Sequence, residues 1–124
     1  MSVMRISKES LDDILTGRVN EDATCVVKFY SNTCHMCQSL HDYYESISEN
    51  TKYGDVHFLA FNIDDDPVVE KNLNFKGVPT IFVVHTHIGN RPATLRMLPD
   101  PENPNDSTWY TVNEIKSFLD KETL

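Results

Sequence analysis

The chain is poor in several kinds of residue, and each shortage excludes a class of protein. It has only three cysteines among 124 residues, and it contains no apolar run of 18 residues. So few cysteines argue against a disulfide-rich secreted scaffold, and the missing apolar run argues against a membrane-spanning helix. Because residues 1–13 turn polar at once, we expect no secretory signal and a cytoplasmic location.

Positive charge is scarce as well. Eleven Lys and Arg face nineteen Asp and Glu, which gives a formal net charge of −8. A surface of this sign repels nucleic-acid backbones and anionic membrane faces, so we expect neither as a partner. The hydrophobic fraction of 40% is high enough for a folded chain, and the length suits one domain over residues 1–124.

The hydrophobic pattern alternates between strand-like and helix-like segments. Apolar and β-branched runs predict strands at residues 4–6, 23–30, 56–63, 79–84 and 93–98. Apolar residues three or four positions apart, with capping residues beside them, predict helices at residues 7–17, 34–48, 66–73 and 111–119. The order β-α-β-α-β-α-β-β-α indicates an α/β protein with helices on both faces of its sheet.

Two of the cysteines form a Cys-x-x-Cys pair, Cys34-His35-Met36-Cys37, at the start of the predicted helix over residues 34–48. In a reducing compartment such a pair is more often redox-active or metal-binding than structural. The third cysteine, Cys25, lies in a predicted central strand, and we expect it to be a buried small hydrophobic residue.

Zinc binding is one alternative for the pair. Cys34, Cys37 and His41 have the spacing C-x2-C-x3-H, and His85 or His87 could complete a set of four ligands. Structural zinc sites usually take their second pair of ligands from another compact knuckle, and the chain has none. We therefore expect no metal.

Three motifs together resemble the thioredoxin family. Cys34-x-x-Cys37 lies between a predicted strand and a long helix, and Phe61-Asn-Ile-Asp64 is similar to the third strand of the family and its exit. Lys76-Gly-Val-Pro79-Thr80 is similar to the family loop that carries a cis-proline opposite the active site. The resemblance spans about residues 4–124 and implies the thioredoxin fold, a central mixed β-sheet flanked by helices on both faces.

The resemblance implies a thiol–disulfide oxidoreductase that reduces protein disulfides, in electron transport and cell redox homeostasis. Unpaired amides at the start of the helix stabilise a thiolate on Cys34, which makes Cys34 the expected nucleophile. Cys37, one turn further in, is expected to resolve the mixed disulfide. This exchange needs no bound cofactor. The expected partners are protein disulfides or dithiols and a thioredoxin reductase or another dithiol donor, and nothing in the sequence demands more than a monomer.

The two residues inside the motif depart from the family pattern. His35 replaces a common glycine and Met36 a common proline. A partly protonated imidazole beside Cys34 stabilises the thiolate, and so makes the disulfide a better oxidant. The alternative is that His35 is merely an exposed and tolerated residue. We expect a protein less reducing than a typical thioredoxin.

Lys28 departs more strongly from the pattern of the thioredoxin family. Many thioredoxins carry a buried aspartate at the matching position as a proton acceptor for the second cysteine. In some, a lysine on the third strand pairs with it, but Ala60 takes that place here. Because Lys28 alternates with Val26 and Tyr30, we expect it to point under the cysteine pair, where its charge favours the thiolate. The alternative is that its side chain extends to solvent.

Four further residues are expected to bind the target. The resemblance implies a cis peptide bond between Val78 and Pro79, with the Val78 backbone offered to an extended peptide. Thr33 stands where the family has a tryptophan before the first cysteine, and we expect Tyr30 to supply the aromatic surface instead.

A loop insertion at about residues 99–108, which ends in Trp109-Tyr110, replaces a tight turn beside the active site of the family. It either shapes the target groove or is a surface insertion with Trp109 packed back on the domain. Two other functions stay open. One is a disulfide oxidase or isomerase of more oxidising potential. The other is a redox-inactive thioredoxin-fold binding module whose cysteine pair is structural or holds zinc.

Overall fold

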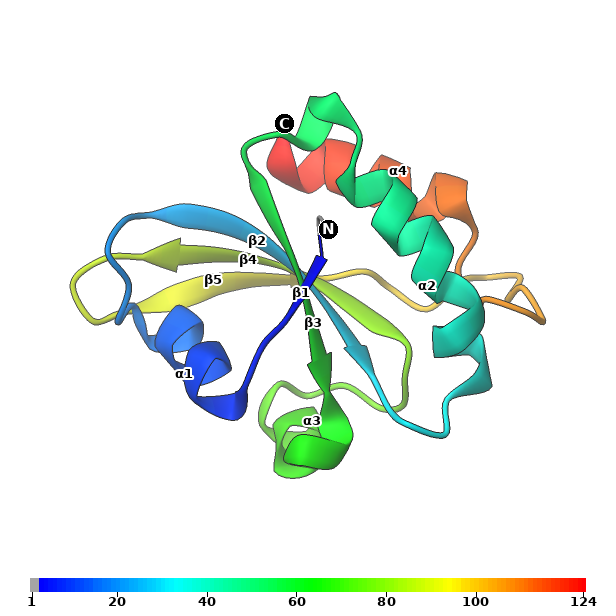
Figure 1. The fold of residues 1–124 in the computed structure, drawn as a ribbon, viewed down its shortest axis with the longest axis horizontal. Helices are drawn as coiled ribbons and strands as arrows, with labels where there is room; N and C mark the ends of the chain where they lie inside the picture. The colour runs from blue at the N-terminus through cyan, green and yellow to red at the C-terminus, as the bar shows by residue number, and fades with distance from the viewer. Residues whose placement is uncertain (1–2) are drawn as a thin grey trace.

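The protein is described by a computed structural model that covers residues 3–124 (Figure 1). Its strands are β1 Val3–Arg5, β2 Ala23–Tyr30, β3 Val56–Asn62, β4 Thr80–His87 and β5 Arg91–Met97. Its helices are α1 Lys8–Thr16, α2 His35–Ser48, α3 Val68–Asn72 and α4 Val112–Thr123, with short 3-10 turns at Thr51–Tyr53 and Ile63–Asp65. The predicted order of strands and helices is confirmed. None of the described helices is long and apolar enough to cross a membrane.

The five strands form one mixed sheet in the order β1-β3-β2-β4-β5. β1 and β2 run parallel to β3, whereas β4 runs antiparallel to both β2 and β5. This arrangement confirms the predicted α/β architecture. It also brings the end of β2, which leads to the cysteine pair, to the same edge of the sheet as the start of β4.

The helix termini follow the capping residues of the sequence. Ser7 Oγ accepts a hydrogen bond from Ser10 N at 3.1 Å, and Gly17 ends α1 with a φ of 79° that favours glycine. Thr111 and Glu114 form the predicted capping box of α4. The helix α3 begins at Val68, two residues after the start of the predicted segment 66–73, with Pro67 in the cap position. The Asp66 carboxylate accepts a hydrogen bond from Val68 N at 3.2 Å just before this start.

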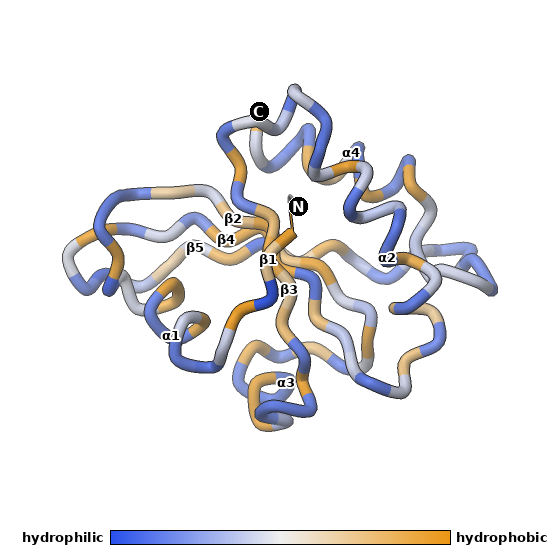
Figure 2. Tube along the Cα trace, in the orientation of Figure 1, coloured by the Kyte–Doolittle hydropathy of each residue, from blue (hydrophilic) through white to orange (hydrophobic). Residues whose placement is uncertain are grey.

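Each face of the sheet has its own hydrophobic core. Val26, Phe58 and Ile81 point toward α2 and α4, and the neighbouring strand residues Val27 and Phe29 point toward α1 and α3. Figure 2 shows the apolar strands crossing the middle of the molecule, with polar segments on the loops around them. The strands were predictable because these side chains alternate between two buried faces.

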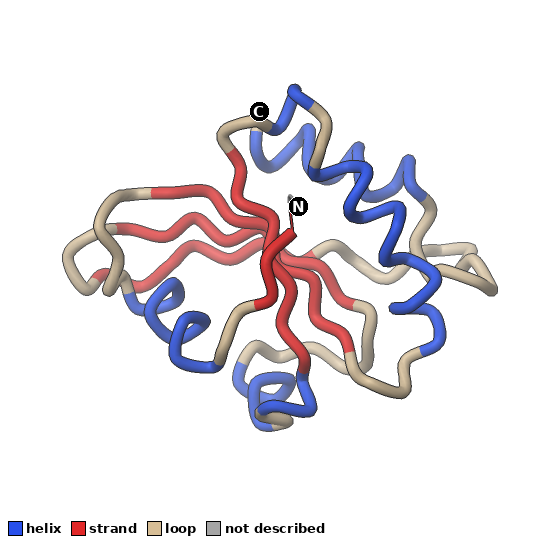
Figure 3. Tube along the Cα trace, viewed as in Figure 1, coloured by secondary structure: helices blue, strands red, loops and turns tan. Residues whose placement is uncertain are grey.

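The segment between β5 and α4 is irregular, as Figure 3 shows. Asn105 and Trp109 exchange two backbone hydrogen bonds of 3.0 and 2.9 Å. The Asn105 side-chain oxygen accepts from Ser107 N and Thr108 N, which closes the turn. Trp109 is half-buried and packs against the core under α2 and α4. The indole is therefore part of the packing of the fold.

Candidate active site

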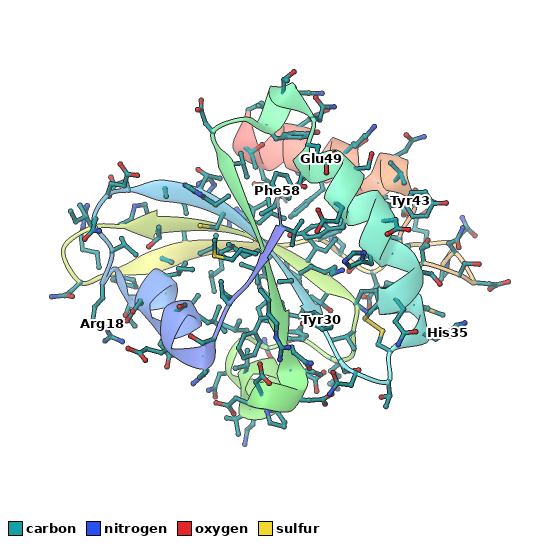
Figure 4. The ribbon with its side chains drawn as sticks, viewed as in Figure 1. Arg18, Tyr30, His35, Tyr43, Glu49 and Phe58 are labelled. Atoms are coloured by element: carbon teal, nitrogen blue, oxygen red, sulfur yellow. A yellow bond between two sulfur atoms is a disulfide. The ribbon has the colours of Figure 1, made fainter. Side chains whose placement is uncertain are left out.

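Cys34 and Cys37 form a disulfide at the N-terminus of α2 (Figure 4). Their Cα atoms are 5.2 Å apart. Cys34 is the N-cap of the helix, and its Sγ accepts a hydrogen bond from Cys37 N at 3.0 Å. Cys34 is half-buried, but Cys37 is only 3% exposed. Of the two sulfurs, Cys34 is therefore the one that another molecule can approach.

The turn before Cys34 is fastened to the end of β3. Asn32 N donates to Asp64 Oδ2 at 2.9 Å, and the buried Asn62 donates through Nδ2 to Asn32 Oδ1 at 2.7 Å. Cys34 N in turn donates to Ser31 O at 3.3 Å. This network holds in place the turn that leads into Cys34. The sequence reasoning missed it, although Asn62 and Asp64 belong to the Phe61–Asp64 motif.

The loop before β4 lies against Cys34. The Val78–Pro79 peptide bond is cis, and Val78 O is 3.6 Å from Cys34 Sγ. Pro79 is buried and Val78 is half-buried. Thr80 Oγ1 donates to Gly77 O at 2.8 Å, which braces the loop from its other end. The structure therefore brings Val78 and Pro79 to the sulfur that other molecules can reach.

The other predicted site residues surround the first turn of α2. His35 and Thr33 are exposed, while Met36 and Tyr30 are half-buried. In Figure 4 the labelled His35 lies beside the disulfide, and Tyr30 lies at the end of β2. An exposed hydroxyl and an exposed imidazole thus flank Cys34 in the chain, while Tyr30 lines a cleft that Cys37 also lines.

Lys28 is buried, with 4% of its surface exposed, so the alternative that it extends to solvent is wrong. On the neighbouring strand β3, Ala60 is its pairing partner. The Lys28 Nζ lies 5.7 Å from the centre of the Tyr30 ring and 5.0 Å from the centre of the Tyr44 ring. Burial lowers the pKa of Lys28 to about 8, against a smaller upward effect of the Glu45 charge. A lysine with this pKa exists in both protonation states near neutral pH.

Lys28 lines a cleft between α2 and the strands β1, β2 and β3. The cleft has a volume of about 440 Å³, and its lining includes Val3, Arg5, Lys28, Cys37, Tyr44 and Glu45. Lys28 and Cys37 thus face one space, as the alternation of β2 predicted. The cleft itself was not predicted, because it depends on how α2 sits above the sheet.

The histidines of the zinc alternative do not meet the cysteines. His41 is exposed and pairs with Asp42 at 3.1 Å. His85 and His87 lie toward the end of β4, which starts beside Pro79 and runs away from the cysteine pair, and they contact Thr24 and Thr94 instead. Within residues 3–124, no three His, Cys, Asp or Glu are grouped as metal ligands. The geometry gives the zinc alternative no support.

Cys25 is a free cysteine with 4% of its surface exposed, as predicted. It packs in the core toward α1 and α3, on the face opposite α2. Burial raises the pKa of its thiol to about 11, so the reactive thiolate is scarce at neutral pH. Cys25 takes no part in the candidate site.

Comparisons with known proteins agree with this geometry. The model of the family described as Thioredoxin matches residues 2–94. Among solved structures, a thioredoxin of Malassezia sympodialis is 15% identical, with a TM-score of 0.69 over 99% of this chain and 92% of its own. The Trx4 domain of ERdj5 is 16% identical, with a TM-score of 0.71 over 100% and 99% of the two chains.

A third solved structure, thioredoxin f from spinach chloroplast, is 22% identical, with a TM-score of 0.57 over 74% of this chain and 81% of its own. These three likenesses show the thioredoxin fold. No curated protein sequence matches the chain. The family match and the disulfide of Cys34 and Cys37 together support a thiol–disulfide oxidoreductase. Since the family model covers most of its length, the chain belongs to the thioredoxin family.

Proposed function

We propose that the protein reduces disulfides of other proteins by dithiol exchange. The observation that carries this proposal is the Cys34–Cys37 disulfide at the accessible N-terminus of α2. A pair that can close in this geometry can store and release two electrons without any cofactor.

In the reduced protein, the first amides of α2 stabilise a thiolate on Cys34, and Cys37 N already points at this sulfur. The thiolate attacks one sulfur of the target disulfide, and the other target sulfur leaves as a thiolate. Cys37, after losing its proton, attacks the Cys34 sulfur of the mixed disulfide. The second target sulfur leaves, Cys34 and Cys37 are joined, and the target has gained two electrons.

The target is proposed to bind as an extended segment along the loop before β4. The Val78 backbone lies beside Cys34, where it can pair with a peptide as an added strand does. Pro79 fixes the direction of that backbone, and Tyr30 and Thr33 are proposed to contact the target on the other side of the sulfur. Main-chain pairing of this kind suits many sequences, so the proposed substrates are protein disulfides in general.

Lys28 is proposed to ease the deprotonation of Cys37. A cation in the same cleft favours the thiolate over the thiol. Its neutral fraction can also accept the proton, because the pKa of Lys28 is lowered to about 8 by burial. We further propose that a thioredoxin reductase or another dithiol donor recycles the protein, and that it works as a monomer in the cytoplasm.

A second candidate function is disulfide oxidation or isomerisation. This function is favoured by the buried Lys28, which lines the same cleft as Cys37 and whose positive charge would stabilise the thiolate and therefore the reduced protein. A more stable reduced form makes the disulfide a stronger oxidant. His35 and Met36, in place of the residues common in the family, are proposed to act in the same direction.

The Cys37→Ser variant tests the proposed exchange. Without the resolving thiol, the mixed disulfide between Cys34 and a target persists, and intact mass should report one target joined to each chain. Addition of dithiothreitol should release it. The Cys34→Ser variant is the matched control and should trap nothing. Trapping through Cys34→Ser but not through Cys37→Ser would contradict the roles assigned to the two sulfurs.

The His35→Gly variant is expected to be more reducing than the unaltered protein. Removing an imidazole beside Cys34 destabilises the thiolate, so the reduction potential should fall by about 10–30 mV. Equilibration with thiol–disulfide buffers near pH 6.5 measures the change, and His57→Gly, at an exposed position of β3, is the control. A potential equal to that of the unaltered protein would mean that His35 is only a tolerated surface residue.

A further inference from the structure

The cleft beside Cys37 has room for a small molecule that disulfide exchange does not require. Its volume of about 440 Å³ lies in the range of small-molecule sites in proteins. Ala60 stands directly across from Lys28 on β3, and its single methyl group leaves the space above this strand open. Val3 and Arg5 of the edge strand β1 form the outer wall.

At the base of the cleft lies a cation without a partner of opposite charge. Lys28 is 4% exposed, and within the described residues its ammonium has the rings of Tyr30 and Tyr44 as neighbours, but no hydrogen-bond acceptor. The Tyr44 ring is fixed, since its hydroxyl donates to Val26 O and Leu59 O at 3.0 and 2.8 Å. Among the described residues, no fully buried side-chain nitrogen or oxygen lacks a hydrogen-bond partner, so the Lys28 ammonium, which makes no such bond, is open to the cleft. An anion bound there would offset the cost of burying its charge.

The other charged side chains that line the cleft either already have a partner of opposite charge or are themselves negatively charged. Arg5 donates two hydrogen bonds to the Asp65 carboxylate, at 3.1 and 3.0 Å. His41 pairs with the neighbouring Asp42. Glu45 lines the same cleft and acts on Lys28 through its charge, yet the two form no ion pair within 4.0 Å. Among the described cations of the cleft, Lys28 is therefore the one that a ligand can neutralise.

We propose that this cleft binds a small monocarboxylate with an apolar or aromatic body, with the carboxylate on Lys28. The body lies between the tyrosine rings and the Val3 and Ala60 side chains. Asn32 and Gln38, at the rim, offer amide groups to any polar substituent. Glu45 disfavours a second negative charge, so a monoanion is preferred to a phosphate dianion.

The test is a binding titration of the oxidised protein with benzoate, followed through amide chemical shifts at pH 7.0. Because the disulfide is closed, neither cysteine of the pair can react, and the outcome does not depend on the proposed disulfide exchange. Benzamide has the same shape without the charge, and it should bind at least about tenfold more weakly. Inorganic phosphate should also be weaker, and the shifts should centre on the residues of the cleft.

Variants assign the binding to Lys28. Lys28→Met keeps the length of the side chain without its charge and should weaken benzoate binding at least about tenfold. Lys121→Met, on the exposed end of α4, should leave it unchanged. Glu45→Gln removes the opposing charge and should strengthen binding about two- to fivefold.

The pH dependence of benzoate binding to the unaltered chain is a second test, which does not require Lys28→Met to fold. Only the protonated lysine binds the carboxylate, and the pKa of Lys28 lies at about 8. The dissociation constant should therefore rise about tenfold between pH 7.0 and pH 9.0. Either of two results would overturn the proposal: benzamide binding as tightly as benzoate, or shifts that lie outside the cleft.

Discussion

Replacing Cys34 by serine is expected to lower the rate of protein-disulfide reduction at least about a thousandfold. The reason is that a serine hydroxyl is not ionised at neutral pH, whereas the Cys34 thiolate is stabilised by the amides at the start of α2. The measurement is turnover of a disulfide-bonded protein substrate, with dithiothreitol as the electron donor.

Cys25→Ala is the matched control, because Cys25 is the remaining cysteine of the chain and lies in the opposite core. It should keep its rate within about twofold of the unaltered protein. Cys37→Ser should also lose multiple turnover, but only after one target has been bound to Cys34. Full activity of Cys34→Ser would contradict the assignment of Cys34 as the nucleophile.

Lys28→Met is expected to raise the free energy of unfolding by about 2–3 kcal/mol at pH 7. Lys28 is 4% exposed, and burial lowers the pKa of its side chain from 10.5 to about 8. Each unit of pKa difference corresponds to about 1.4 kcal/mol. The rings of Tyr30 and Tyr44 offset a part of the free-energy cost of burying the charge. Methionine fills the same space without a charge.

The sign of the pH dependence separates this explanation from simple packing. Below about pH 8 the lysine is protonated in both the folded and the unfolded chain, so the cost of burying the charge is fully present. Between about pH 8 and pH 10.5 the unfolded chain binds more protons, and the unaltered protein becomes more stable as the pH rises. The advantage of the variant should therefore shrink across this range.

Urea unfolding of both oxidised proteins at pH 7 and pH 10 measures that difference. Tyrosines and other groups that titrate in this range are common to both chains, so their contributions cancel. In the reduced protein, the same variant should also raise the pKa of Cys37, since the cation that favours its thiolate is gone. A variant that is less stable at pH 7, or an advantage that persists at pH 10, would contradict the buried-charge account.

The sequence was most informative where structure is decided locally. Ser7, Gly17 and the pair Thr111 and Glu114 mark their helix ends through backbone hydrogen bonds within one turn. The strands were recognisable because both of their faces are buried, and alternation along β2 placed Lys28 on the side of the cysteine pair. The prediction ended β4 three residues too early, because His85 and His87 weaken its apolar pattern, and it began β5 two residues too late.

What the sequence did not reveal depends on contacts between distant segments. The burial of Lys28 depends on Tyr44, which lies on α2 and places its ring next to the Lys28 ammonium. The hydrogen bonds of Asn32 with Asn62 and Asp64 join positions 30 and 32 residues apart. The cleft exists because Ala60 is small where α2 crosses the sheet, and no local pattern encodes that crossing.

The reduction potential of the Cys34–Cys37 couple tests the central claim most directly. It is measured by equilibrating the protein in defined thiol–disulfide buffers and counting thiols by intact mass. We expect a reversible two-electron couple that is less reducing than the value of about −270 mV typical of thioredoxin, because of His35 and Lys28. A value between about −180 and −120 mV would favour the oxidase or isomerase function. If the pair shows no reversible couple, disulfide exchange is contradicted and the redox-inactive binding module becomes the better account.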